Sequence, residues 1–173
     1  MMKRQDAMRG LGGERAFFKA ALFRAAGAAA LATARQEHYP APAENPVVLR
    51  GTLQADLARR DFTINAMALD LVAGELIDLH HGQEDLASGQ LRFLHVGSVQ
   101  DDPTRVIRAA RYAARLGFQL AEESSKQIRS TIQEWPWDWR PGDAATAAPP
   151  ALSTRLRMEL ERLLEREPWP QAL

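Results

Sequence analysis

A carboxylate and a guanidinium lie three residues apart in the second half of the chain, at Asp102 and Arg105. On a helix, an acceptor and a donor at this spacing can form one flat edge that carries both kinds of hydrogen-bonding group. Cytosine and adenine each present an amino donor beside a ring-nitrogen acceptor and match such an edge, whereas uracil and guanine present the reverse. The pair is therefore a candidate for reading a nucleobase.

The same two residues also have a purely structural explanation. An aspartate directly before Pro103 suits the N-cap of a helix, and Arg105 could simply pair with that aspartate. The residues by themselves leave both explanations open.

The element that must position this pair is a helix expected from about Pro103 to Leu116 and ended by Gly117. One face of this helix is predicted to be cationic, and the other, with Val106, Ala109, Ala110, Ala113 and Ala114, is predicted to be core. A solvated charged face is the common explanation of such a pattern. The cationic face consists of Arg105, Arg108, Arg111 and Arg115.

Other parts of the chain carry weaker signals. The alanine-rich stretch 14–36 is expected to be locally helical, the proline-containing stretch 37–48 a surface loop, and 135–151 a linker. Short helices or helical turns are expected at 52–60 and 83–88, strands at 64–71, 75–79 and 91–94, and longer helices at 123–134 and 152–165.

Composition limits the class of protein. The chain has 173 residues, 46% of them hydrophobic and 25% charged, so one domain or one compact unit with a small appendage is expected. Its 22 basic and 22 acidic residues cancel, so any nucleic-acid surface must be a local patch. It has no cysteine, no bilayer-length apolar run and no secretory signal pattern, so no membrane partner and a cytoplasmic location are expected.

Three stretches, read in order, carry a family resemblance. RRDFTINAMALDL, IDLHHGQEDLASGQLRFL and DDPTRVIRAARYAARLGF resemble the class II tRNA nucleotidyltransferases, or CCA-adding enzymes, and the bacterial poly(A) polymerases. The resemblance extends upstream through ATARQEHYPAPAENPVVLRGTLQADLARRD and covers about residues 31–120. LSTRLRMELERLL is similar to the family's neck helix, with Thr154 where a glutamate is usual.

The resemblance implies an α+β fold: a partial nucleotidyltransferase head with a mixed sheet, followed by an all-helical neck. The corresponding domain boundaries are an unassigned alanine-rich segment at 1–30, the head at 31–100 and a helical, RNA-binding neck at 101–173. The implied activity is template-independent addition of CMP or AMP to RNA 3′ ends, tRNA first of all, from CTP or ATP and with Mg²⁺.

The resemblance also implies roles for individual residues. Arg60, Asp61 and Asn65 match the positions that bind the phosphates and ribose of the incoming nucleotide. Asp101, Asp102 and Arg105 match the positions that read the base, although the first is usually glutamate in the bacterial CCA-adding branch. The arginines farther along the same helix, Arg108, Arg111 and Arg115, are the candidates for RNA phosphate contacts.

The family's metal-binding carboxylates have no counterpart in the sequence. LGGER at 11–15 supplies two glycines without the following VRD, and no D-x-D is found, so catalytic carboxylates and metal ligands stay unassigned. We therefore expect the isolated chain to be inactive and to need a complementing N-terminal fragment. A frameshift, natural loss, a split enzyme, and a non-catalytic nucleotide- or RNA-binding remnant are all open explanations.

Two further clusters have simpler explanations than chemistry. His80 and His81 precede Glu84 and Asp85, but adjacent histidines on a strand point to opposite faces and are poorly placed to share a metal ion. Three alternating tryptophans at 135–139 could stack on bases, although packing between domains is the simpler expectation.

Overall fold

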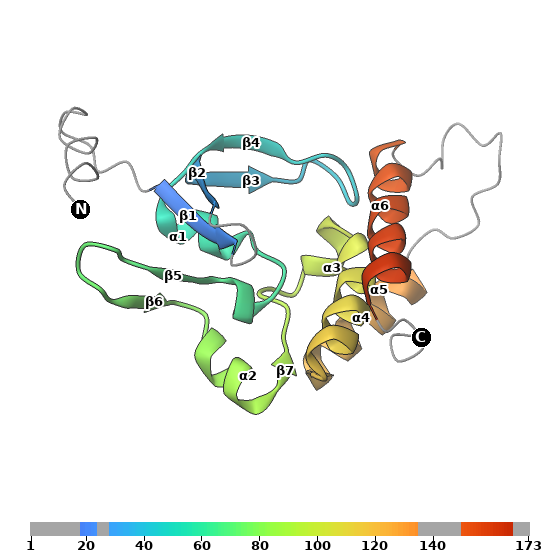
Figure 1. Cartoon of the computed structure of the whole chain (residues 1–173). Coiled ribbons are helices and arrows are strands. Elements are labelled where there is room, and N and C mark those ends of the chain that lie inside the picture. The colour runs from blue at the N-terminus through green and yellow to red at the C-terminus, as the bar shows by residue number, and fades with distance from the viewer. Residues whose placement is uncertain (1–17, 24–27, 135–149, 168–173) are drawn as a thin grey trace.

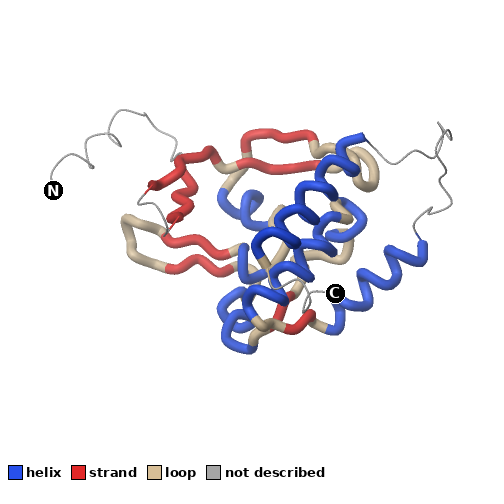
Figure 2. The backbone as a smooth tube through the Cα atoms, turned by 45° about the vertical axis from the view of Figure 1, so that its right-hand side comes forward, coloured by secondary structure: helices blue, strands red, loops and turns tan. Residues whose placement is uncertain are grey.

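The structure is a computed structural model that describes residues 18–23, 28–134 and 150–167. The hairpins and the short helices up to residue 88 occupy one side of the molecule, and the helices from residue 98 onward gather on the other (Figure 1). Figure 2 traces the same backbone with helices in blue and strands in red. The strands are β1 (Phe18–Phe23), β2 (Ala28–Thr33), β3 (Arg35–His38), β4 (Val47–Arg50), β5 (Met67–Leu69), β6 (Leu76–Asp78), β7 (Gln90–Leu91) and β8 (Gln119–Leu120). The helices are α1 (Leu53–Ala58), η2 (Thr63–Asn65), α2 (Gly82–Ser88), α3 (Ser98–Asp101), α4 (Thr104–Leu116), α5 (Glu122–Glu134) and α6 (Pro150–Arg166).

The described strands form four two-stranded sheets. Strands β1–β2, β3–β4 and β5–β6 pair as antiparallel hairpins, and β7 pairs in parallel with β8 across the intervening helices. The predicted α+β class is confirmed, and both strand orientations occur, although in separate small sheets.

The prediction of a local helix at 14–36 is wrong for the described residues, which form β1, β2 and the start of β3. Phe18 pairs with Thr33 and Phe23 with Ala28 in one antiparallel register. Alanine favours helix only by a few tenths of a kcal/mol per residue, and an isolated helix without an apolar stripe to bury is marginal in water. Pairing between neighbouring strands therefore overrides the propensity.

The loop expected at 37–48 is shorter than predicted, because β3 and β4 occupy its two ends. Its three prolines remain outside both strands, where their missing N–H groups cost no ladder hydrogen bond. The expected linker at 135–151 and its tryptophans lie almost wholly outside the described residues.

Most of the other sequence-predicted elements are found close to their expected bounds. Two predicted strands are shorter than expected: residues 63–65 form η2, so only β5 remains of the strand expected at 64–71, and the strand expected at 91–94 is reduced to β7. Thr52 caps α1 by accepting from the backbone N–H of Ala55 at 3.2 Å. Gly117 ends α4 with φ of 68°, a left-handed conformation that favours glycine. The expected N-cap at Asp102 is shifted by one residue to Pro103, because Asp102 serves as the C-cap of α3.

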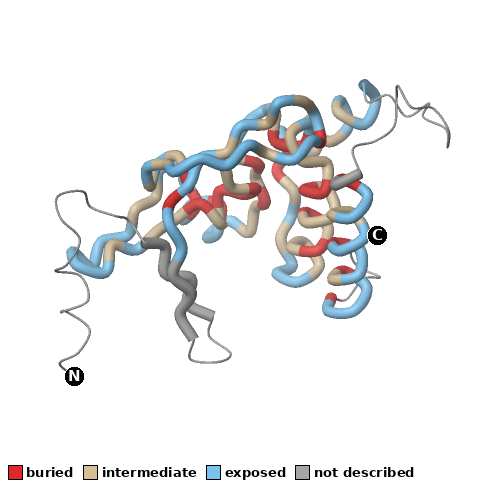
Figure 3. The backbone as a smooth tube through the Cα atoms, turned by 90° about the horizontal axis from the view of Figure 1, so that it is seen from above, coloured by how far each residue is buried: buried red, intermediate tan, exposed pale blue. Residues whose placement is uncertain are grey.

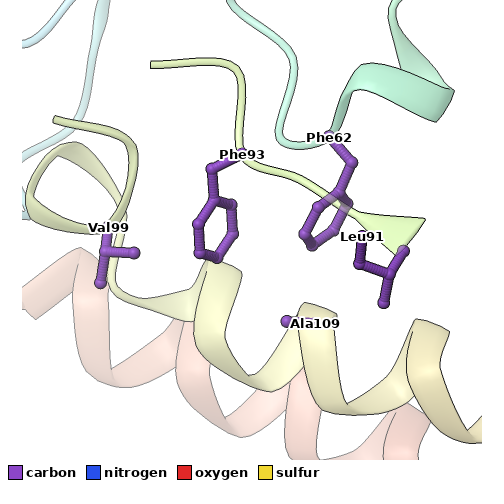
Figure 4. Packing of buried hydrophobic residues seen from close by; sticks show 5 residues of the cluster. All are labelled: Phe62, Leu91, Phe93, Val99 and Ala109. Carbon is purple, nitrogen blue, oxygen red and sulfur yellow. The ribbon is translucent and has the colours of Figure 1, made fainter. Parts of the chain in front are cut away.

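A small apolar core joins the hairpin side to α4. Figure 4 shows five side chains of this core, of which Ala109 lies on α4 itself: Phe62, Leu91, Phe93, Val99 and Ala109. The rings of Phe62 and Phe93 stack with centroids 5.2 Å apart, and Tyr112 meets Phe62 edge-on at 5.6 Å. Buried positions gather between the helices and around this core, whereas β3 and β4 are mostly exposed (Figure 3). The core therefore fixes α4 against the segment that follows Asp61.

No helix in the described ranges is long and apolar enough to span a bilayer.

Candidate nucleotide-binding site

Two adjacent arginines follow α1 and are held by two carboxylates. Arg60 donates from Nη2 to Asp56 Oδ2 at 2.6 Å and from Nε to the Asp56 carbonyl at 3.0 Å. Arg59 donates from Nη2 to Asp56 Oδ1 and from Nη1 to Glu37 Oε1, both at 2.7 Å. Glu37 also pairs with Arg35 on the same strand, β3. Three cations and two anions thus form one compact cluster, which leaves a net positive charge.

Asp61 is buried and engaged at both of its oxygens. Oδ1 accepts from the backbone N–H of Phe62 and from Asn65 Nδ2, both at 2.9 Å. Oδ2 accepts from Nε and Nη2 of Arg108 on α4. The structure therefore brings Asp61 and Asn65 into direct contact and adds Arg108 to them, and their binding of phosphates and ribose stays a prediction.

The charge of Asp61 is maintained against its burial. Burial by itself would raise its pKa, but the Arg108 charge and the donors around both oxygens hold the pKa below its usual range. Burial would lower the pKa of Arg108, but the negative charge of Asp61 outweighs burial, so the pKa of Arg108 is raised. Both groups are ionised at neutral pH.

Arg105 is buried, with 4% of its surface exposed, and its guanidinium is oriented by backbone carbonyls. Nη1 donates to the Ser98 carbonyl at 3.3 Å and Nη2 donates to the Arg59 carbonyl at 3.1 Å. The second bond joins residues 46 positions apart and connects α4 directly to the end of α1. A planar guanidinium held at two nitrogens presents its remaining N–H donors in fixed directions.

Asp102 faces α6 as well as its own helix. Its Oδ1 accepts from the N–H and the hydroxyl of Thr104, at 3.1 and 2.7 Å, and its Oδ2 lies 3.4 Å from Arg155 Nη1. Arg155 in turn donates to the Ala43 carbonyl at 2.7 Å in the β3–β4 connection. The observed partners of Asp102 are thus Thr104 and Arg155, and those of Arg105 are backbone carbonyls.

Asp101 ends α3 beside a histidine. Its Oδ2 lies 3.7 Å from His95 Nε2, a distance compatible with an ion pair when the histidine is protonated. Burial and the nearby Arg105 charge lower the pKa of His95, and Asp101 opposes them only in part. His95 is therefore mainly neutral at neutral pH.

Tyr39 is an additional member of this region that the sequence did not indicate. Burial raises the pKa of its phenol, and Arg105, Glu37, Asp102 and Arg155 are its charged neighbours. The β3–β4 connection thus brings an aromatic ring next to the predicted base-reading residues. No motif signalled Tyr39, whereas Arg155 lies in the helix that resembles the family's neck.

The arginine face of α4 is not the solvated surface that its pattern suggested. Arg111 lies 3.3 Å from Glu159 Oε2 and 3.7 Å from Glu167 Oε1, and Arg115 donates to both oxygens of Glu167. Arg108 donates to Glu159 at 3.3 Å in addition to Asp61. Glu159 lies on α6 and Glu167 directly follows its last residue, so this face is an ionic layer against the C-terminal helix, buried at Arg111 and exposed at Arg115. RNA contacts by Arg108, Arg111 and Arg115 stay a prediction.

The described residues do not present a site that fits Mg²⁺. No group of three or more histidine, aspartate or glutamate side chains in the described ranges is arranged to hold a metal ion. Asp85, in the histidine-rich segment considered above, accepts from Thr63 at 2.7 Å and from Arg92. The carboxylates of Asp61 and Asp102 are likewise directed at arginines.

Comparison with known proteins identifies the class. Residues 2–92 match the model of the poly(A) polymerase head domain, so the chain belongs to that family. The matched range includes most of the alanine-rich segment, and the proposed boundaries at 30 and 100 stay predictions.

Individual relatives agree with this assignment. Over 131 residues the chain is 44% identical to the CC-adding tRNA nucleotidyltransferase of Deinococcus radiodurans, which covers 66% of the chain and 35% of the relative. It is 52% identical over 84 residues to the multifunctional CCA protein of Laribacter hongkongensis, covering 48% and 20% of the two chains.

Solved structures show the same similarity. An apo CCA-adding enzyme superposes with a TM-score of 0.68 at 38% identity, covering 82% of this chain and 31% of that enzyme. The Thermotoga maritima CCA-adding enzyme complexed with tRNA superposes with a TM-score of 0.57 at 37% identity, covering 70% and 28%. The chain thus spans between about a fifth and about a third of the length of these relatives.

Proposed function

We propose that this chain supplies the nucleotide-selecting part of an activity that adds CMP or AMP, from CTP or ATP, to tRNA 3′ ends. Arg60, Asp61 and Asn65 bind the phosphates and ribose of the incoming nucleotide. Asp101, Asp102 and Arg105 select its base.

One observation carries the proposal. The Arg105 guanidinium donates to the carbonyl of Arg59, so the predicted base-reading helix is fastened to the predicted phosphate-binding segment. Two stretches 46 residues apart, assigned to two parts of one nucleotide, therefore lie together. Arg108 makes a second link of the same kind through Asp61.

The proposal also names partners beyond the nucleotide. The RNA 3′ end is placed near Arg108, Arg111 and Arg115, because arginines bind phosphates without reading sequence. Mg²⁺ is the expected cofactor of the complete activity, with ligands outside the described residues, and action on tRNA implies a cytoplasmic location.

The direct test is nucleotide incorporation. Purified chain is incubated with tRNA lacking its 3′ end, Mg²⁺ and labelled CTP or ATP, alone and with a fragment carrying the GG…VRD and D-x-D motifs. We expect incorporation only with the fragment, because the sequence has neither motif. Robust incorporation by the chain alone would show that other carboxylates assemble the metal site. Failure to bind CTP or ATP would refute the proposed function.

A non-catalytic nucleotide- or RNA-binding protein is the second candidate, favoured by the same lack of a D-x-D motif. It predicts that CTP, ATP or RNA binds to the chain while no fragment restores incorporation. Whether the reconstituted activity adds CC, A, CCA or a poly(A) tail is then read from the length and sequence of the product.

Base selection gives a residue-level prediction for the reconstituted enzyme. Arg105→Ala should reduce the preference for CTP and ATP over UTP and GTP, because it removes a charge-assisted hydrogen bond of about 1.5–3 kcal/mol that only the matching bases receive. The measurement is relative kcat/KM for the four nucleotides, with thermal unfolding to check the fold. Arg115→Ala, on the same helix, should weaken RNA binding without changing base choice. Equal losses for all four nucleotides in Arg105→Ala would withdraw the base-reading assignment.

A further inference from the structure

Asp56 is an internal carboxylate that neither the sequence motifs nor the proposed function uses. It lies on α1 with 3% of its surface exposed. Both oxygens are directed at arginines: Oδ1 accepts from Arg59 Nε and Nη2 at 3.0 and 2.7 Å, and Oδ2 accepts from Arg60 Nη2 at 2.6 Å. The backbone N–H of Arg35 approaches Oδ1 at 3.3 Å. A buried carboxylate with this set of partners is anionic and precisely placed.

Asp56 holds the Arg60 guanidinium at two of its three nitrogens. The side chain and the carbonyl of Asp56 together engage Nε and Nη2, which fixes the plane of the guanidinium. Among the described residues, no partner is seen for the third nitrogen, Nη1. An arginine loses substantial side-chain entropy when it is ordered, so a group that orders it beforehand lowers the cost of binding an anion.

We infer that Asp56 is a positioning residue that orients Arg60 toward the phosphates of the incoming nucleotide, an inference that rests on the proposed role of Arg60. Arg59 and Glu37 complete the arrangement on its other side, where Glu37 holds Arg59 Nη1. Because Arg59 also offers its carbonyl to Arg105, the same cluster connects phosphate binding to the base-reading helix.

The competing explanation is that Asp56 only fastens α1 to β3 through the Arg35 N–H. The two explanations differ in what they predict for ligands with different numbers of phosphates. A residue that acts through a phosphate-binding arginine affects CTP more than CDP and CDP more than CMP. A residue that only stabilises the fold affects all three alike.

The experiment compares Asp56→Asn with the wild-type chain by calorimetric titration of CTP, CDP and CMP at one ionic strength. Asparagine keeps the shape and one acceptor but removes the charge. We expect CTP binding to weaken about tenfold, the order of one charge-assisted hydrogen bond, and CMP binding to change less than about twofold. In an Arg60→Ala background, Asp56→Asn should have no further effect on CTP, since the two act as one unit.

The matched control is Asp85→Asn. Asp85 is also buried, at 5% exposure, and pairs with Arg92 and Thr63 in the same half of the chain. It should lower thermal stability without changing the ratio of CTP to CMP affinity. If Asp56→Asn does not fold, Asp56→Glu keeps the charge and should show a smaller loss with the same dependence on phosphate number.

The outcomes separate the two proposals. Equal weakening of CTP, CDP and CMP, or an unchanged CTP affinity in a folded Asp56→Asn chain, overturns the positioning role and leaves the proposed function intact. Absence of CTP binding by the wild-type chain overturns the proposed function and the role of Asp56 with it.

Discussion

The two faces of α4 are held in the molecule by different forces. One face contributes Ala109 to the apolar core around Phe62 and Phe93. The other carries arginines that pair with Asp61, with Glu159 of α6 and with Glu167, which directly follows α6. Tyr112 lies between them, with its ring edge-on to Phe62 and two arginine guanidinium groups within 5.8 Å of its centroid.

The comparison indicates that one face contributes most of the free energy of unfolding, whereas the other fixes the geometry of charged side chains. Apolar burial is non-directional and scales with area, so the core face should dominate the free energy of unfolding. Ion pairs gain attraction but lose hydration, so their net stabilisation is small while their geometry is exact. In α4 the arginine face, with its defined ion-pair geometry, is the one that holds Asp61 in its proposed ribose-binding position.

The largest effect is expected from Phe62→Ala. Phe62 is fully buried and contacts both Phe93 and Tyr112. Truncating a buried phenylalanine costs about 3–5 kcal/mol through lost burial and a residual cavity. Urea unfolding followed by circular dichroism measures this loss. Val72→Ala, at a side chain with 88% exposure, is the control and should change stability by less than about 0.5 kcal/mol. A smaller loss for Phe62→Ala than for Glu159→Gln on the arginine face would show that the ion pairs, and not the apolar core, dominate the free energy of unfolding.

A smaller effect is expected from Glu159→Gln on the ionic face. The Glu159 side chain is 7% exposed and lies within ion-pair distance of Arg108, Arg111 and Arg162. Removing its charge leaves partly buried guanidinium groups less well paired, at a cost of about 1–3 kcal/mol. The same unfolding measurement applies. Glu161→Gln, on the same helix with a 56% exposed side chain, should be nearly neutral. Equal losses in the two variants would show that burial of the pair is irrelevant.

Acidification should weaken the ionic face selectively. The folded-state pKa of Asp61 lies below the ordinary value of 3.8, so its contribution is fully present above pH 3.8 and is lost as the pH falls through the lower folded value. Burial would raise the pKa of Asp56, but the hydrogen bonds from Arg59 and Arg60 outweigh it, so this pKa too lies below its ordinary value. Unfolding free energy measured between about pH 6 and pH 2 should therefore fall, and Asp61→Asn should flatten part of that fall. An unchanged pH profile in Asp61→Asn would contradict the assigned pKa.

The sequence predicted the two faces unequally, and the reason is physical. The apolar face of α4 follows from a local period, and the helix bounds follow from Pro103 and Gly117. The ionic face depends on Glu159 and Glu167, which lie 51 and 52 positions from Arg108 and Arg115, and no local pattern encodes that pairing. The ion pairs of Asp56 with Arg59 and Arg60 could, by contrast, have been predicted from the sequence, because spacings of three and four residues bring side chains together on a helix.

The smallest effect is expected where an ion pair has neither burial nor a network. Lys126 and Glu122 are spaced by four residues on α5, with Nζ and Oε1 2.8 Å apart, but their side chains are 65% and 74% exposed. Water screens such a pair, and ordering two long side chains costs entropy, so Glu122→Gln should cost less than about 0.5 kcal/mol. Unfolding in low and high salt measures the difference, which should vanish at high salt, where exposed charges are screened within a few ångströms. A loss larger than that of Glu159→Gln, whose carboxylate is buried among three arginines, would mean that neither burial nor a network of partners sets the strength of ion pairs in this chain.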